Sequence, residues 1–501
     1  MTNNLDDKKR QLFENAPVLK AILSLAIPSI IGQLILVIYN MTDTFFIGQA
    51  SKLIDPALSS ELVAGVTICM PVYMIISAIS NLFGIGAASV ISRSLGKNNP
   101  WRAKNSSRFA FWGCLFSTAI YCLLVLAVSR PISMFLSGNA PETAAFAREY
   151  ILYCVVIFGI PTALNTLFSH LIRAQGKSFH ASIGIAIGGL LNCALDPLFM
   201  FVLFPIEKAA MAAAIATGVA NTIALLYYVV LFITTRKSLV ISVKFSTKAF
   251  SENIPGEVLK IGAPAALMTL CENISYMILD NLVGTVILAK GATEAALQES
   301  AAALAGIGVA KKINMLAHSV VRGMTQGVLP LIGYNKSSGN RKRMASIVYV
   351  SGMISLCIAI ICMVASLIWA RPFSQIFVHE EASIARASEF LRILCIGAPF
   401  SALAYTVISF FQAVGKAWRS LILALLRKGI LDIPLMYIFY VVAVYGNNPY
   451  GPELIVWATP IADIICSIVA MILFFYYLKN NGQNKMKENE AKLVEAMDQP
   501  S

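Results

Sequence analysis

Residues 173–177 read Arg-Ala-Gln-Gly-Lys, and residues 412–416 read Gln-Ala-Val-Gly-Lys. The alanine, glycine and lysine of the first motif return in the second at a constant offset of 239 residues. A motif that returns half a chain later indicates an internal repeat. We therefore expect the chain to consist of two like halves.

The correspondence extends outward from this motif in both directions, with offsets between 236 and 242 residues. The further matched pairs are Pro28 and Pro264, Asp43 and Asp280, Gly86 and Gly323, Gly96 and Gly333, Asn98 and Asn335, Arg130-Pro131 and Arg371-Pro372, Pro161 and Pro399, and Ala216-Thr217 and Ala458-Thr459. Two like halves in a membrane protein, with a few acids inside apolar segments, are typical of secondary transporters whose site lies between the repeats.

The composition identifies the solvent of this chain as a lipid bilayer. Of its 501 residues, 57% are hydrophobic and only 13% are charged, which is too few polar side chains to cover a soluble globule. Apolar segments of about 20 to 30 residues can cross a hydrocarbon core of about 30 Å. The sequence predicts twelve such helices, at about 20–48, 61–88, 109–135, 147–172, 179–204, 209–234, 257–288, 300–330, 345–376, 386–414, 420–444 and 450–477.

Basic residues predict the orientation in the membrane. When the 39 lysines and arginines are assigned to the two sides, 29 fall on the side of the N-terminus. The positive-inside rule then places both termini in the cytoplasm. We expect a multi-pass protein of the cell membrane, namely the cytoplasmic membrane of a bacterium. The net charge of +13 indicates loops that face anionic lipid. No basic run is interleaved with aromatics, so nucleic acid is not an expected partner.

The helix pattern divides the chain into two lobes joined by a basic linker. The predicted parts are a cytoplasmic N-terminal segment at 1–19, an N-lobe with helices 1–6 at 20–234, a cytoplasmic linker at 235–256, a C-lobe with helices 7–12 at 257–477, and a cytoplasmic tail at 478–501. The ten cysteines lie in apolar segments without a C-x-x-C motif, so we interpret them as packing residues.

Ionisable residues inside the apolar segments are the candidates for function. A charge at the centre of a spanning helix costs about 2.5 to 3.5 kcal/mol, so those that remain usually face a cavity or a partner. In the first half, Tyr39 and Asp43 are one helical turn apart, and so are Asn192 and Asp196, which precede Pro197. These side chains offer oxygen atoms and negative charge, which suit a proton or a hard cation such as sodium.

The second half has different residues at the corresponding places. Asn192 corresponds to Lys428 and Asp196 to Asp432, so the motif N-x-x-x-D has become K-x-x-x-D, which can neutralise itself. The apolar segments of this half also carry Glu272, Asp280, Lys311, Lys312 and Asp463. Two interpretations stay open for these charges, a salt-bridged lobe and a wall that faces the substrate.

The motifs together resemble those of the multidrug and toxic compound extrusion (MATE) family over about residues 20–477. They are Pro28, the string from Tyr39 to Thr44 closed by Ile47-Gly48-Gln49, Arg173-Ala174-Gln175-Gly176-Lys177, Asn192-x-x-x-Asp196-Pro197 and Ala213-Ala214-Ile215-Ala216-Thr217. The resemblance implies an all-α polytopic fold with two pseudo-symmetric six-helix bundles around a central cavity. It also implies export of organic, often cationic, compounds in exchange for protons or sodium ions.

Residue by residue, the resemblance places a cation-coupling site in the N-lobe, on Tyr39, Asp43, Asn192, Asp196 and Thr217. If sodium is the coupling ion, its ligands are expected on Asp43, Asn192, Asp196 and Thr217. Some family members use acids of the C-lobe, but the basic pair Arg427-Lys428 departs from that pattern. Candidates for the substrate cavity are Met41, Phe45, Phe46, Met200, Phe201, Asp280, Lys312 and Lys428, and Pro28 is expected to kink its helix.

Other functional classes make different demands on the sequence. A lipid-precursor flippase of the same broad superfamily has the same repeat but needs a cationic cavity for a pyrophosphate, which the acidic N-lobe opposes. A channel needs a filter loop or a ring of pore-lining residues, and neither is visible. An enzyme needs a nucleophile set or a phosphate loop, which are also not visible. We expect a monomer whose partners are organic cations and membrane lipid. We expect no cofactor.

Overall fold

The computed structural model describes residues 11–54, 56–235, 239–289, 291, 293–446 and 451–497, with side chains described for these residues except 56, 57 and 481–497. Apolar runs form long helices throughout, because a helix satisfies its own backbone hydrogen bonds. The first half contains the π-helical turn η1 (Gln11–Asn15), α2 (Val18–Ser51), α3 (Pro56–Ile68), α4 (Met70–Gly96), α5 (Pro100–Leu136), α6 (Pro141–Ile151), η2 (Leu152–Ile157), α7 (Gly159–Arg173), α8 (Ser178–Leu198), η3 (Phe199–Leu203), η4 (Ile206–Lys208) and α9 (Ala209–Thr234).

The second half follows the 3-10 turn η6 (Thr247–Phe250) and is again helical. It contains α10 (Ile254–Leu288), α11 (Glu294–Ser337), α12 (Arg341–Ile368), α13 (Ala370–Gln375), α14 (Glu381–Ile396), α15 (Ala398–Ala413), α16 (Ala417–Leu425), the π-helical turn η7 (Leu426–Leu431), α17 (Asp432–Tyr445), α18 (Gly451–Val456) and α19 (Ala458–Met497).

These elements make twelve spans, six in each half, as the sequence predicted. In the described part of the chain, eight helices are long and apolar enough to cross a membrane, and ten when two bent pairs each count as one span. The bends are 52° between α6–η2 and α7 and 44° between α14 and α15. The other two spans are α11, which is 44 residues long but carries several charges, and the run α16–η7–α17.

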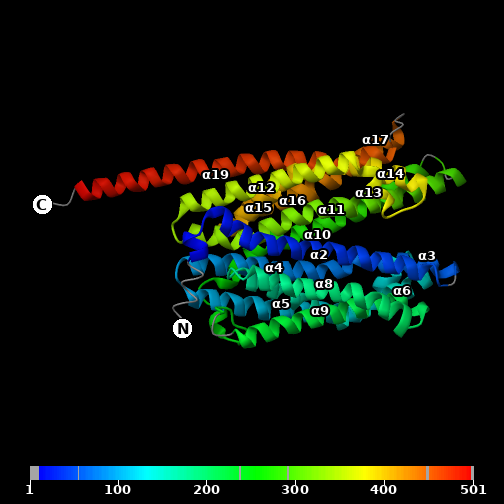
Figure 1. Cartoon of the computed structure of the whole chain (residues 1–501), viewed down its shortest axis with the longest axis horizontal. Coiled ribbons are helices and arrows are strands. Elements are labelled where there is room, and N and C mark those ends of the chain that lie inside the picture. Colours follow the sequence, from blue (N-terminus) through cyan, green and yellow to red (C-terminus); the bar gives the residue numbers. More distant parts are fainter. Residues whose placement is uncertain are drawn as a thin grey trace.

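The two halves lie side by side as two layers of roughly parallel helices (Figure 1). The helices α2 to α9 form one layer, the N-lobe, and α10 to α19 form the other, the C-lobe. The first residues of α2 and the last of α19 lie at the same end of the molecule (Figure 1). An even number of spans requires this arrangement.

The repeat is visible in the ends of the helices. The side chain of Asn99 accepts a hydrogen bond from the backbone N–H of Arg102 at 2.9 Å and starts α5. Asn340, 241 residues later, accepts one from Arg343 at 3.2 Å and starts α12. Gly176 and Gly415 both have positive φ, +81° and +77°, at the turns before α8 and α16. The repeated motif therefore encodes a repeated turn that favours glycine.

The lobes meet along two helix pairs, α4 with α10 and α2 with α11, through glycines that let the backbones approach closely. A Cβ atom on Gly86 would lie 2.2 Å from the carbonyl oxygen of Val258, and one on Gly262 would lie 1.7 Å from that of Leu82. Gly323, the repeat partner of Gly86, has the same role, since its Cβ would lie 2.4 Å from the Cα of Ile30.

Polar contacts also hold the two lobes together at the end of the molecule where α2 begins. Glu257 of α10 accepts hydrogen bonds from Arg102 at 2.9 Å and from Arg93 at 3.5 Å. Asn335 of α11 donates to the backbone carbonyl of Phe13 at 3.1 Å, and Phe13 and Tyr334 pack with ring centroids 4.9 Å apart. The two lobes are therefore closed against each other at this end.

Three details differ from the sequence-based expectations. The last helix does not end near residue 477, because α19 continues to Met497. The 29 basic residues counted on the N-terminal side include Arg322, Arg427 and Lys428, which lie in α11 and η7 and not in loops. The linker also packs on the N-lobe, since the backbone N–H of Val240 donates to Gln175 at 2.7 Å. Pro28 lies inside the single helix α2.

Candidate functional site

Two cavities lie between the lobes on the far side of this closure. One has a volume of about 240 Å³ and is lined by Tyr39, Asn192 and Thr217 of the N-lobe and by Glu272 and Arg322 of the C-lobe, among others. The other, of about 320 Å³, lies nearer the opposite end of α2 and has lining residues from both lobes. In either cavity, called below the central cavity (240 Å³) and the outer cavity (320 Å³), a small molecule can contact both lobes at once.

The structure brings three of the predicted coupling residues into direct contact inside the N-lobe. Asn192 and Asp196 lie one turn apart on α8, and the amide of Asn192 donates to Asp196 Oδ1 at 3.1 Å. The same amide group donates to Thr217 Oγ1 of α9, also at 3.1 Å. All three side chains are buried, and Asp196 has no exposed surface. Thr217 therefore holds the amide nitrogen toward α9 and leaves the amide oxygen for another partner.

Several oxygen atoms of the five predicted coupling residues, called together the N-lobe cluster below, have no hydrogen-bond donor. Asp43 Oδ1, Asn192 Oδ1 and Asp196 Oδ2 are buried without a partner among the described residues. Buried acceptors of this kind are rare and costly, above all on a carboxylate. The composition of the cluster therefore suits a positive ligand, either a proton or a cation.

Asp43 itself faces the C-lobe rather than a basic residue of its own lobe. It lines the 320 Å³ cavity together with Lys312 of α11. No ion-pair partner of either residue is found within the described ranges, and the two residues share the lining of this cavity. Because 269 residues separate Asp43 from Lys312, no local sequence pattern could have predicted their proximity.

In the C-lobe, the motif K-x-x-x-D neutralises itself as predicted. Lys428 donates to Asp432 Oδ2 at 2.7 Å, and Ser275 donates to the same oxygen at 2.6 Å. Thr459 donates to Asp432 Oδ1 at 3.0 Å, so both carboxylate oxygens are satisfied. Lys428 belongs to the π-helical turn η7 and is almost completely buried. Turns of this type occur frequently at functional sites.

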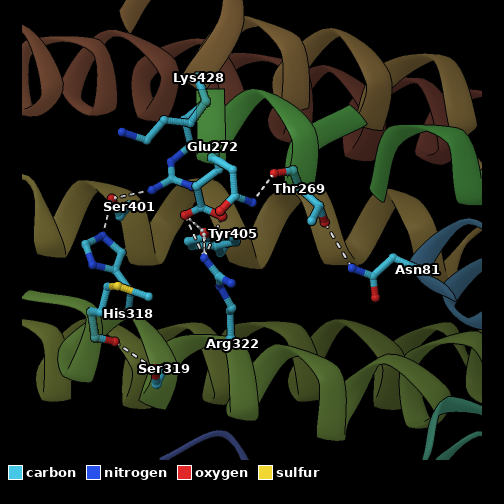
Figure 2. Close-up of polar contacts among 12 residues, drawn as sticks. Asn81, Thr269, Glu272, His318, Ser319, Arg322, Ser401, Tyr405 and Lys428 are labelled. Carbon is cyan, nitrogen blue, oxygen red and sulfur yellow. Dashed lines mark hydrogen bonds and ion pairs between the residues drawn. The ribbon is translucent and has the colours of Figure 1, made fainter. Parts of the chain in front are cut away.

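A second ion pair of the C-lobe joins η7 to the last helix. Arg427 donates to Asp463 Oδ1 at 2.7 Å, and Ser401 donates to Asp463 Oδ2 at 2.6 Å. His318 lies 3.1 Å from the hydroxyl oxygen of Ser401, as drawn in Figure 2. The guanidinium of Arg427 lies 4.2 Å above the ring centre of Tyr405. The network is buried and continuous with the wall of the central cavity.

The third ion pair forms that wall. Arg322 of α11 donates to both oxygens of Glu272 at 2.6 Å, and Tyr405 also donates to Glu272 at 3.1 Å. Figure 2 shows these three side chains converging, with Asn81 of the N-lobe reaching Thr269 nearby. Sequence reasoning missed Arg322 and Tyr405. Arg322 lies inside the predicted helix at 300–330, but its partner Glu272 is 50 residues away, and a tyrosine in an apolar helix gives no signal of its own.

The two lobes therefore treat their buried acids differently. Every carboxylate oxygen of Glu272, Asp432 and Asp463 has a donor, whereas the N-lobe retains unpaired oxygens. Asp280 is also paired, with Lys311, and this pair lines the outer cavity next to Asp43. The salt-bridge interpretation accounts for the pairs of Lys428 with Asp432 and of Arg427 with Asp463. The pairs of Arg322 with Glu272 and of Lys311 with Asp280 are ion pairs that also line a cavity.

The apolar candidates for the substrate cavity occupy other places. Met200 is buried in the hydrophobic core, and Phe45 is 58% exposed on the surface. Phe46 and Phe201 pack together with ring centroids 6.1 Å apart, and Met41 is half-buried. The linings of the two cavities do not include these five residues. The apolar and aromatic lining comes instead from Tyr73, Met74, Tyr276 and Met315.

Comparison with known proteins agrees with this architecture. The family model MatE matches the chain twice, at residues 28–198 and at residues 264–438. This chain belongs to the MatE family. Its two matches begin at Pro28 and Pro264, the first pair of the internal repeat, and each covers most of one lobe. It is a multi-pass membrane protein and not an enzyme.

Curated relatives share the full length of the chain. The multidrug export protein MepA of Staphylococcus saprophyticus is 26% identical over 98% of this chain and 100% of that protein. MepA of Staphylococcus aureus is 26% identical over 94% of this chain and 96% of that protein. Among solved structures, MATE in complex with MaL6 has a TM-score of 0.82 at 21% identity, over 95% of this chain and 99% of that one. A MOP superfamily transporter from Pyrococcus furiosus has a TM-score of 0.81 at 21% identity, over 94% of this chain and 98% of that one.

Proposed function

We propose that this member of the MatE family is a secondary active multidrug efflux transporter, which exchanges organic, mainly cationic, compounds for protons or sodium ions by alternating access. The observation that carries the proposal is the cluster of unpaired buried oxygens on Asp43, Asn192 and Asp196 beside the cavities between the lobes. Such a cluster gains free energy from a cation and has no other partner in the described residues.

The exchange follows from competition for negative charge. A cation that enters from outside binds the N-lobe acids and removes the charge that attracts a cationic drug, so the drug leaves outward. When the ion leaves to the cytoplasm, the acids regain their charge and attract the next drug molecule. Glu272 keeps its partner Arg322 throughout, so the C-lobe wall contributes shape and polarity rather than a variable charge.

The charges of the two cavities oppose the flippase alternative. Arg322 is balanced by Glu272 in the central cavity. In the outer cavity, Lys311 and Lys312 are balanced by Asp280 and Asp43. A carrier of a lipid pyrophosphate needs an excess of positive charge at its site, and neither cavity has one.

We also propose the boundaries and the orientation. The lobes are 20–234 and 257–477, with cytoplasmic segments at 1–19, 235–256 and 478–501. With both termini in the cytoplasm, the closed end of the molecule is the cytoplasmic end and the cavities belong to an outward-facing state. One chain encloses the whole pathway, which supports a monomer as the transporting unit, with lipid around its apolar surface.

Reconstituted transport with separately imposed gradients tests the proposal. The purified protein is placed in liposomes, and accumulation of a fluorescent organic cation is followed with a sodium gradient alone and with a proton gradient alone. We expect one gradient to drive accumulation and an ionophore for that ion to abolish it. Drug movement that ignores both gradients overturns the proposal.

A further inference from the structure

The coupling cluster of the N-lobe has a counterpart in the C-lobe at every position but one. Asp196 corresponds to Asp432, and Thr217 to Thr459, by the offsets of the repeat. Tyr39 corresponds in the same way to Tyr276, 237 residues later. The exception is Asn192, whose counterpart is Lys428.

The hydrogen bonds of the two clusters also correspond. In the N-lobe, the residue one turn before the acid donates to it, from Asn192 to Asp196 at 3.1 Å. In the C-lobe the same position donates to the same acid, from Lys428 to Asp432 at 2.7 Å. The threonine of the neighbouring helix contacts each cluster, and the ammonium of Lys428 lies 5.3 Å from the ring centre of Tyr276. The two clusters therefore share an acid, a threonine and a tyrosine. Besides Asn192 and Lys428, they differ at Ser275, whose counterpart is Ile38, and in the threonine bond, which joins Thr217 to Asn192 but Thr459 to Asp432.

They differ in what remains unsatisfied. The N-lobe cluster leaves Asn192 Oδ1 and Asp196 Oδ2 without a donor. The C-lobe cluster leaves neither oxygen of Asp432 without one, because Lys428, Ser275 and Thr459 surround it. The positive group that is missing from the first cluster is thus present in the second, covalently attached to the chain.

We propose that the C-lobe contains a second site for a small monovalent cation, occupied permanently by the ammonium group of Lys428. This inference rests on the proposed function and adds a residue that confines ion coupling to one lobe. Asp43 also has no ion-pair partner among the described residues, whereas its C-lobe counterpart Asp280 is paired with a lysine, Lys311. Both ammonium groups lie beside Tyr276, at 5.3 and 5.6 Å from its ring centre. The cation site of the C-lobe therefore stays occupied by an ammonium group, while the cation site of the N-lobe alternately binds and releases the coupling ion.

The proposal predicts that ion binding can be moved between the lobes by one residue. Lys428→Asn removes the attached cation and leaves the oxygens of Asp432, Ser275 and Thr459, which are suitable ligands for sodium or a site for a proton. Asn192→Lys attaches a cation one turn before Asp196 and fills the N-lobe site. The first variant should gain a cation site, and the second should lose one.

Cation binding by the purified full-length protein in detergent tests both variants. Binding of radioactive sodium and proton uptake after an acid step are measured per folded protein, with folding judged by gel filtration. We expect Lys428→Asn to double the uptake of the coupling ion relative to the wild type, and Asn192→Lys to abolish it at near-normal abundance. Asn165→Lys is the matched control, because it adds the same charge to a cavity-lining position with no acid one turn away, and its abundance should fall.

The outcomes separate this inference from the proposed function. A wild type without any cation uptake sinks the proposed function and this inference with it. If the wild type takes up a cation but folded Lys428→Asn gains nothing, only the inference is overturned. It is also overturned if Asn192→Lys keeps the wild-type uptake, a result that does not depend on the stability of Lys428→Asn. Equal abundance and equal loss of uptake in Asn165→Lys and Asn192→Lys would attribute the effect to any added charge and contradict the inference as well.

Discussion

At the scale of single residues, a buried acid in this protein is defined by its partner. Asp43 and Asp196 contribute unpaired oxygens, whereas Asp432 and Asp463 are surrounded by donors. A paired acid inside a membrane is a structural element, and removal of its partner strands a charge. An unpaired acid is expected to bind the coupling ion in another state of the transport cycle. The four acids should therefore respond differently to the same substitution.

The substitution Asp43→Asn is expected to abolish coupled efflux and to leave abundance unchanged. It conserves volume, and no hydrogen bond to Asp43 is found among the described residues, so no internal contact is lost. Drug susceptibility and membrane abundance are measured in the same cells. Thr42→Val, on the neighbouring position of α2, is the control and should retain resistance. Normal resistance at normal abundance of the Asp43 variant would remove Asp43 from the coupling site.

The substitution Asp432→Asn should instead reduce folding and abundance. It leaves the buried ammonium of Lys428 without its counter-charge, which costs roughly 3 to 5 kcal/mol for a broken buried pair. Adding Lys428→Gln should restore much of the abundance, because both charges are then gone. Abundance and thermal unfolding of the single and double variants check this. A well-expressed but inactive single variant that the second change does not rescue would place Asp432 in the transport site.

At the scale of helices, sequence patterns predicted the contacts within one helix and missed those between helices. Lys428 and Asp432 were paired from the sequence because a separation of four residues puts both on one face. The ion pair of Arg322 with Glu272, and the position of Lys312 across from Asp43, depend on how α10, α11 and α2 pack. The repeat fixed the number of helices in each lobe, but it carries no information on side-chain contacts between the lobes.

The glycine contacts between α4 and α10 are expected to control closure of the end where α2 begins. Gly262→Ala places a methyl group 1.7 Å from the carbonyl oxygen of Leu82, so the two backbones must separate. Ser89 of α4 is fully buried and donates to the backbone carbonyl of Gln412 in α15 of the other lobe. A cysteine at Ser89 should then become accessible to a thiol reagent, while transport falls. The control Gly352→Ala meets its nearest neighbour at 3.4 Å and should change neither. A Ser89 cysteine that stays protected in Gly262→Ala contradicts this role of the interface.

At the scale of the whole molecule, the sequence predicted the class of fold, the twelve spans and the pseudo-symmetry, because apolar length and repeated motifs are properties of the chain alone. The cavities were not predictable in the same way. Of the apolar residues expected in them, Met200 lies in the core and Phe45 on the surface, since helix rotation decides which face meets the partner lobe. Tyr276 and Met315, which were not among the predicted residues, line the central cavity.

Orientation is tested by labelling in intact cells. Cysteines introduced at Ser246 and Ser337, both at the closed end of the molecule, should be shielded from an impermeant thiol reagent. One introduced at Asn447, which lies outside the described residues, should react. The physical reason is the excess of basic residues on the side of the N-terminus. The opposite labelling would reverse the membrane orientation and with it the direction assigned to transport.

Exchange of a drug for a cation is the central claim, and it is tested most directly by driving the exchange with a drug gradient in place of an ion gradient. Liposomes that contain the purified protein receive an outward gradient of an organic cation and no ion gradient, and movement of protons and of sodium is recorded. The account predicts that one of these ions moves inward against the drug, and that Asp43→Asn abolishes the ion movement. Drug efflux without ion movement, or an ion that moves in the same direction as the drug, would contradict it.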